Sequence, residues 1–123
     1  MSRMKIIVCE DEAIIGLDIV SILKSKGYSD VVATQNPLAL IAEANSSNPC
    51  LIITDINLKA VINGIEAIDL IRKRSGKDTG VIFITGTNYS PEEIANDTYT
   101  RVIKKPFKSS HLLNVVKELE QLY

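Results

Sequence analysis

The sequence predicts an α/β fold in which five parallel strands form a doubly wound sheet with helices on both faces. Three observations support this prediction. Short apolar runs without polar–apolar alternation recur along the 123 residues, as expected of strands that are buried on both faces. Stretches with apolar residues at helical spacing separate these runs. Such alternation is typical of a parallel sheet, and right-handed crossovers then place helices on both of its faces.

The five expected strands are, in chain order, 6–9, 31–33, 50–54, 81–84 and 101–104. Each is rich in Val, Ile or other apolar residues, and the second run is the weakest of them. Loop and turn residues lie on both sides of each apolar run, and each run is therefore short enough to be a strand.

Two helices are expected in the first half of the chain. The first covers residues 13–26 and stops at Gly27, a residue typical of helix C-termini. Its apolar side consists of Ile15, Ile19, Ile22 and Leu23. The second begins at Asn36, whose side chain is a good N-cap, and Pro37 suits its first position.

Three further helices are expected in the second half. One covers residues 65–74. A capping box that begins at Ser90 opens a helix that reaches only about Asp97, so this helix is short. Ser109 or Ser110 caps the last helix, and its apolar residues recur at helical spacing.

Composition limits the classes of function. The 46% of hydrophobic residues can form a core, and a net charge of −1 argues against a nucleic-acid or membrane surface held by charge. The length favours one domain, residues 1–123. The apolar runs are too short for a secretory signal or for the roughly 20 residues of a membrane helix. Together with two cysteines, Cys9 and Cys50, interpreted as reduced thiols, this predicts a cytoplasmic protein.

Polar side chains follow four of the five strands. They are Glu10, Asp11 and Glu12 after the first strand, Asp55 after the third, Thr85 after the fourth and Lys105 after the fifth. In doubly wound sheets the ligand site lies outside the carboxyl ends of the strands. Acids after a strand often only begin a helix, and Glu12 fits that interpretation. The occurrence of complementary groups after four strands nevertheless predicts a site at this edge.

The residue types at this edge are suited to phosphoryl transfer. Crowded carboxylates repel one another, and Mg²⁺ relieves the repulsion. Asp11 and Asp55 can supply two oxygen ligands, and a backbone carbonyl near Asn57 a third. Lys105 can hold a phosphoryl oxygen and the Thr85 hydroxyl can donate to another. An aspartate is a competent nucleophile towards phosphorus, so Asp55 is the candidate acceptor.

These residues carry a resemblance that covers essentially the whole chain. The segments are Val8-Cys9-Glu10-Asp11-Glu12, Thr54-Asp55-Ile56-Asn57-Leu58, Gly64, Thr85-Gly86 and Lys105-Pro106-Phe107. In this order, each at a strand end, they resemble the receiver domain of two-component response regulators. The resemblance implies a flavodoxin-like (βα)5 fold with strand order 2-1-3-4-5.

The resemblance also implies a metal site. Asp55 would be the phosphoacceptor and a Mg²⁺ ligand, and Asp11 would bind Mg²⁺ directly. Glu10 would bind it mostly through water, and Asn57 would provide its backbone carbonyl. The implied cofactor is therefore Mg²⁺.

The implied activity is that of a phosphoryl-accepting switch and not of an enzyme proper. Thr85 and Lys105 would contact the phosphoryl group, and the Lys105-Pro106 peptide bond would be cis. The donor would be a histidine kinase or a phosphotransfer protein, and the switch would assist its own phosphorylation and dephosphorylation. Phosphorylation would change the face made by residues 90–97, strand 101–104 and the last helix. This face would then meet a downstream effector or a second copy, without direct contact with nucleic acid or membrane.

The chain departs from the family pattern in three places. Gly64 lies nine residues after Asp55, so the loop between them is longer than is usual. Val102 stands where family members often carry an aromatic residue that rotates inward on activation. The segment between Thr85 and Lys105 is short. We therefore expect activation to move Thr85 without a large aromatic rotation.

Other interpretations remain open at this point. The acids could cap helices, with Lys105 a solvated surface charge. A flavodoxin-like cofactor binder would need a Ser/Thr/Gly-rich phosphate loop after the first strand, where this chain has acids. A hydrolase that uses Asp55 as nucleophile would need an acid at Asn57. A receiver-like interaction module could signal without phosphorylation, and the chain could be a receiver excised from a hybrid kinase.

Overall fold

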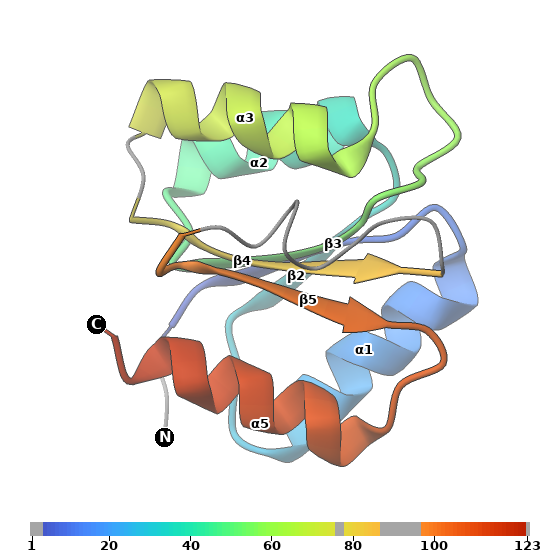
Figure 1. The fold of residues 1–123 in the computed structure, drawn as a ribbon, viewed down its shortest axis with the longest axis vertical. Helices are drawn as coiled ribbons and strands as arrows, with labels where there is room; N and C mark the ends of the chain where they lie inside the picture. The colour runs from blue at the N-terminus through green and yellow to red at the C-terminus, as the bar shows by residue number, and fades with distance from the viewer. Residues whose placement is uncertain (1–3, 76–77, 87–96, 123) are drawn as a thin grey trace.

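A parallel sheet of five strands forms the middle layer of the protein (Figure 1). The computed structural model describes residues 4–75, 78–86 and 97–122. In chain order the elements are β1 (Ile6–Cys9), α1 (Ala13–Ser25), β2 (Val31–Thr34), α2 (Pro37–Ser47), β3 (Leu51–Asp55), α3 (Gly64–Ser75), β4 (Gly80–Thr85), β5 (Thr100–Lys104) and α5 (Ser109–Glu120). The strand order is β2-β1-β3-β4-β5 and all pairs are parallel, which confirms the predicted doubly wound sheet and its order.

Helices cover both faces of this sheet, α2 and α3 on one and α1 and α5 on the other (Figure 1). Successive strand residues point to opposite faces, so each face has its own apolar cluster. Val8 and Ile53 belong to the cluster under α1 and α5, while Ile7 and Ile52 belong to the one under α2 and α3. Each fully buried side chain of this kind contributes roughly 1.5–3 kcal/mol. The two clusters therefore fix which face each strand residue meets.

The strands differ in burial according to their place in the sheet. All residues of β1, β3 and β4 are buried, while β2 lies at an edge and is only partly buried. This edge position explains why residues 31–33 gave the weakest strand pattern. It also agrees with the expectation that strands buried on both faces carry continuous apolar runs.

The register brings the carboxyl ends of four strands together. Cys9 pairs with Thr54, so Glu10 follows β1 close to Asp55 at the end of β3. Asp55 pairs with Ile84, and Thr85 pairs with Lys104. The side chains that end β1, β3, β4 and β5 therefore lie along one edge of the sheet.

The helix boundaries confirm some sequence predictions and correct others. The Asn36 side chain accepts the Ala39 N–H at 2.8 Å, and Pro37 occupies the first turn of α2, as predicted. Gly27 has a φ of 93°, the left-handed conformation expected after α1. Asp55 is the last residue of β3 and does not follow the strand. Glu12 occupies the N-cap of α1 without a side-chain capping bond.

The start of α5 differs from the prediction. The N-cap is Lys108, and no side-chain capping bond forms there, so neither Ser109 nor Ser110 is the cap. The burial of apolar residues such as Leu112 sets where α5 begins, and the position of the nearest good capping residue does not. The short helix predicted from the Ser90 capping box lies outside the described residues.

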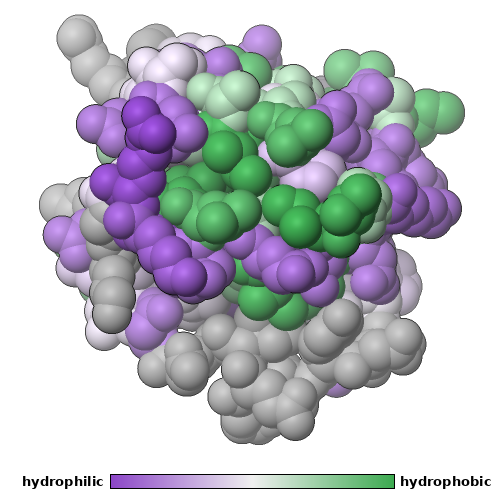
Figure 2. Space-filling view, turned by 90° about the horizontal axis from the view of Figure 1, so that it is seen from above, coloured by the Kyte–Doolittle hydropathy of each residue, from purple (hydrophilic) through white to green (hydrophobic). Residues whose placement is uncertain are grey.

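The described surface carries no membrane-spanning element, because no described helix is long and apolar enough to cross a bilayer. Figure 2 looks onto the face formed by α2 and α3, where apolar side chains gather between hydrophilic ones. Leu38 on α2 and Leu70 on α3 are among the exposed large apolar residues. Cys9 and Cys50 are free thiols, as predicted.

Candidate functional site

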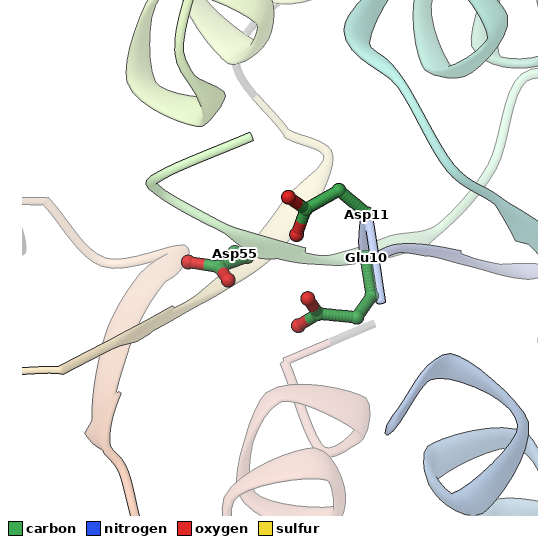
Figure 3. Close-up of side chains that lie close together, drawn as sticks. All are labelled: Glu10, Asp11 and Asp55. Atoms are coloured by element: carbon green, nitrogen blue, oxygen red, sulfur yellow. The ribbon is translucent and has the colours of Figure 1, made fainter. Parts of the chain in front are cut away.

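Three carboxylates converge at the edge of the sheet where the strands end. Glu10 and Asp11 follow β1, and Asp55 ends β3 (Figure 3). One oxygen from each lies within 4.8 Å of the others. Because β1 and β3 are neighbours in the sheet, the chain can bring these acids together although they are far apart in sequence. Three oxygens at this spacing suit a hard divalent cation such as Mg²⁺.

Lys105 connects two of these acids. Its Nζ lies 2.8 Å from Asp55 Oδ2 and 3.3 Å from Glu10 Oε2. Burial by itself would lower the pKa of Lys105, but the hydrogen bond and the negative charge of Asp55, with help from Glu10, raise it. The ammonium group is therefore charged and already lies on a carboxylate oxygen of Asp55.

The backbone holds Lys105 in this position. Its N–H donates to the Thr85 carbonyl at 2.7 Å, and the Lys105-Pro106 peptide bond is cis, as expected. Lys104, the preceding residue, pairs with Thr85 in the sheet. The ends of β4 and β5 thus place Thr85 and Lys105 beside each other.

Asp55 is nearly enclosed, with 6% of its surface exposed. Its Oδ1 accepts the Asn57 N–H at 3.0 Å, and its Oδ2 accepts from Lys105. Each oxygen therefore has a fixed partner, and the carboxylate has one defined orientation. Asn57 itself is exposed, so the loop after β3 reaches the surface immediately beside Asp55.

Glu10 is more deeply buried, with only 1% of its surface exposed. Burial, together with the neighbouring carboxyl groups of Asp11 and Asp55, raises its pKa to about 7. The Glu12 N–H and Lys105 oppose the shift. Negative charge is thus unfavourable here in the absence of an added cation, and a divalent ion would relieve it.

Thr85 contributes the one buried hydroxyl at this edge that lacks a partner among the described residues. The residue is fully buried, and its Oγ1 makes no hydrogen bond within the described part of the chain. Buried polar groups are nearly always hydrogen-bonded, so such a hydroxyl suggests a partner that arrives with a ligand. An orphaned donor beside a converging acidic group and a lysine fits an anion held together with a cation.

The structure brings the predicted residues Glu10, Asp11, Asp55 and Lys105 into one connected group, and the Asn57 N–H donates to Asp55. Thr85 joins this group through the backbone of Lys105. Val102 is half-buried and packs against the cluster on the α2–α3 side, so the sequence-based interpretation of its role stays a prediction.

Two features of the site were not predicted from the sequence. The Lys105–Glu10 ion pair depends on the strand order, which places β1 and β5 on either side of β3 and β4. The contact of Gly64 with the backbone of Asp55 was missed as well. Its signal was a glycine at the first helical turn, a position where better helix formers are available.

Comparison with known proteins agrees with this geometry. A model of the response regulator receiver domain matches residues 6–117. The receiver domain of NtrX from Brucella abortus is 27% identical, with a TM-score of 0.82 over 94% of this chain and 98% of that chain. The chemotaxis response regulator CheY4 of Vibrio cholerae is 24% identical, with a TM-score of 0.82 over 96% and 99% of the two chains. A longer NtrX chain from Brucella abortus is 26% identical, with a TM-score of 0.83, and the match covers 98% of this chain but only 27% of that longer chain. The comparison with curated proteins gives no match.

Proposed function

The chain belongs to the response regulator receiver family of two-component systems, and on this premise we propose that Asp55 accepts a phosphoryl group with the help of Mg²⁺. Receiver domains are signalling switches, and phosphoryl acceptance is implied by the family. The observation that carries the proposal is the Lys105 ammonium, 2.8 Å from an oxygen of Asp55 inside a group of three carboxylates.

The metal ligands in this proposal are Glu10, Asp11, Asp55 and the backbone carbonyl of Asn57. The family binds Mg²⁺ at an acidic pocket, and the converging oxygens together with the raised pKa of Glu10 support that assignment. When bound, Mg²⁺ supplies positive charge to the phosphoryl oxygens and offsets the repulsion among the acids. As the family resemblance implies, Glu10 would act mostly through water.

Asp55 would act as the nucleophile. One carboxylate oxygen forms a bond to phosphorus while the bond between phosphorus and the histidine nitrogen of the donor breaks. The bonding electrons and a proton stay with the donor imidazole, and the product on this chain is an acyl phosphate. The hydrogen bond from Asn57 orients the carboxylate for this attack.

Lys105 and Thr85 would hold the transferred group. The ammonium already lies on Asp55 Oδ2, so it can follow the developing negative charge onto a phosphoryl oxygen. The Thr85 hydroxyl, without a partner among the described residues, can donate to a second oxygen. This gain of a partner by Thr85 would report phosphorylation to the ends of β4 and β5.

The donor in this proposal is a histidine kinase or a phosphotransfer protein, and the output is a downstream effector or a second copy of this chain. The changed face would include β5 and α5. The chain would assist its own phosphorylation and dephosphorylation without being an enzyme for another substrate. We further propose one receiver domain across residues 1–123 and a cytoplasmic location, which the two free thiols support.

The test is direct phosphorylation. The protein with Mg²⁺ and a small acyl phosphate is expected to gain one phosphoryl group by intact mass, and Asp55→Asn is expected to gain none. A beryllofluoride complex, which stands in for the phosphoryl group, should form with the first protein only. If the two proteins gain the same mass and respond to added Mg²⁺ in the same way, the proposal is wrong.

A further inference from the structure

Gly64, the first residue of α3, lies directly against the end of β3. A methyl group on its Cα would overlap the carbonyl oxygen of Asp55 and lie 3.2 Å from both the Asp55 carbonyl carbon and the Ile56 Cα. Backbone atoms cannot move aside as a flexible side chain can. The φ of Gly64 is not in the left-handed region, so glycine is needed here for space and not for its conformational freedom.

Hydrogen bonds on either side of Gly64 hold the start of α3 against the end of β3. The Gly64 N–H donates to the Ile56 carbonyl at 2.8 Å. The next bonds form a reciprocal cap at the start of α3: Asn63 N–H donates to Glu66 Oε1 at 3.0 Å, and Glu66 N–H donates to Asn63 Oδ1 at 2.9 Å. The two ends of the β3–α3 loop, residues 56–63, are therefore held close together.

The base and the tip of this loop differ. At the base, the Asn57 N–H lies 3.0 Å from Asp55 Oδ1, and Leu58 is buried with 3% of its surface exposed. At the tip, Ala60 and Val61 are exposed. The residues that touch the acceptor are thus fixed, while the longer part of the loop lies away from it.

We propose that Gly64 is a positioning residue for Asp55. Its missing side chain lets α3 begin against the Asp55 backbone, and that contact sets where the loop base presents the Asn57 amide to Asp55 and the Asn57 carbonyl to the proposed Mg²⁺. The extra length of the loop is absorbed at the tip, so it leaves the acceptor geometry unchanged. This inference rests on the proposed function of the same site.

The size of the effect follows from the sensitivity of the reaction to geometry. A displacement of about 1 Å at a reacting group can lower a rate by about a hundredfold. Gly64→Ala must move either α3 or the Asp55 carbonyl, since both are backbone. We expect phosphorylation by a small acyl phosphate to fall on the order of a hundredfold and Mg²⁺ binding to weaken.

The experiment compares Gly64→Ala with two controls. Val61→Ala alters the exposed tip of the same loop, and Ile71→Val lowers the stability of α3 without touching the loop. Each variant is assayed for unfolding by urea, Mg²⁺ binding by calorimetry, phosphorylation by intact mass, and the amide resonance of Asn57 by NMR. The Asn57 resonance reports its bond to Asp55 and needs no phosphoryl chemistry.

Support requires that Gly64→Ala shift the Asn57 resonance and weaken Mg²⁺ binding while both controls match the wild type. Equal behaviour of Gly64→Ala and Ile71→Val would overturn the inference, because it would leave only a general loss of stability. If Gly64→Ala does not fold, Asn63→Ala takes its place, with a smaller shift in the same direction expected and no shift overturning the inference. If the wild type itself is not phosphorylated, the proposed function fails, while the resonance and Mg²⁺ measurements still decide the role of Gly64.

Discussion

At the residue scale, the Thr85 hydroxyl combines a cost in stability with a proposed role in phosphorylation. It is fully buried at the end of β4, and its hydroxyl has no partner within the described part of the chain. A buried hydroxyl without a hydrogen bond destabilises the folded state by about 1–3 kcal/mol. In the proposed function, this hydroxyl donates to an oxygen of the phosphoryl group on Asp55.

Replacing Thr85 by Val therefore has opposite effects in the two states. We expect the free energy of unfolding of the unphosphorylated protein to rise by about 1 kcal/mol, because the methyl group needs no partner. We also expect the additional stability conferred by beryllofluoride to decrease. Urea unfolding with and without beryllofluoride measures both, and Thr85→Ser, which keeps the hydroxyl, is the control. A clear loss of stability in Thr85→Val without ligand would show that the hydroxyl is already satisfied.

At the scale of elements, one hydrogen bond connects the turn after α1 to the end of α5. Tyr28 is buried, and its hydroxyl donates to Glu120 Oε1 at 2.9 Å across 92 residues of sequence. Burial, and then the hydrogen bond and charge of Glu120, raise the pKa of Tyr28 to about 12. The folded state therefore keeps the phenol protonated over a range in which the unfolded chain would lose the proton.

The sign of the pH dependence follows from this raised pKa. The ordinary pKa of Tyr28 is 10.0, so its contribution is fully present below pH 10 and is lost as pH rises towards 12. We expect Tyr28→Phe to lower the free energy of unfolding at pH 7 by about 1 kcal/mol, the usual value of one hydrogen bond. The difference between the two proteins should shrink between pH 10 and pH 12. Urea titrations across this range test it, and a constant difference would contradict the assignment.

The helices also show which helix boundaries are determined by neighbouring residues in the sequence and which by packing in the fold. The start of α2 depends on Asn36 and Pro37, and both are predicted by their own backbone preferences. The start of α5 depends on how its apolar side packs against the sheet. The predicted caps, Ser109 and Ser110, therefore lie one or two residues after the actual N-cap, Lys108. Edge strand β2 was the weakest signal because one of its sides has no strand to pair with.

At the scale of the whole molecule, the proposed Mg²⁺ site predicts that stability depends on Mg²⁺. A ligand that binds only the folded state adds about 2.7 kcal/mol at a concentration of a hundred times its Kd. For a chain of this length that corresponds to a rise in Tm on the order of 10 °C. We expect this rise in the wild type. Asp11→Asn should show little of it, and its stability without Mg²⁺ should be equal or higher, because one repelling charge is gone.

Thermal unfolding in the presence and absence of Mg²⁺ makes this measurement, with Asp69→Asn as the control. Asp69 is an exposed acid on α3, outside the acidic group. Equal shifts in the Asp11→Asn and wild-type proteins would contradict a metal site built on Asp11. An equal shift in Asp69→Asn and the wild type is expected.

The sequence by itself determined the fold class and which polar residues meet at one edge of the sheet. Local physics was sufficient, because continuous apolar runs require a doubly buried strand and the polar residues at their ends must then lie at one edge. The same pattern predicts that Glu10, Asp11, Asp55, Thr85 and Lys105 lie together at that edge.

Only the tertiary structure decided how these groups contact one another. The bonds of Lys105 to both Asp55 and Glu10, the unpartnered hydroxyl of Thr85 and the close approach of Gly64 to Asp55 all depend on distances between segments far apart in the chain. Spacing in a sequence carries no information on such distances until strand order and register are set. Asp55 is thus identifiable from its neighbours in sequence, whereas its orientation is a property of the folded sheet edge.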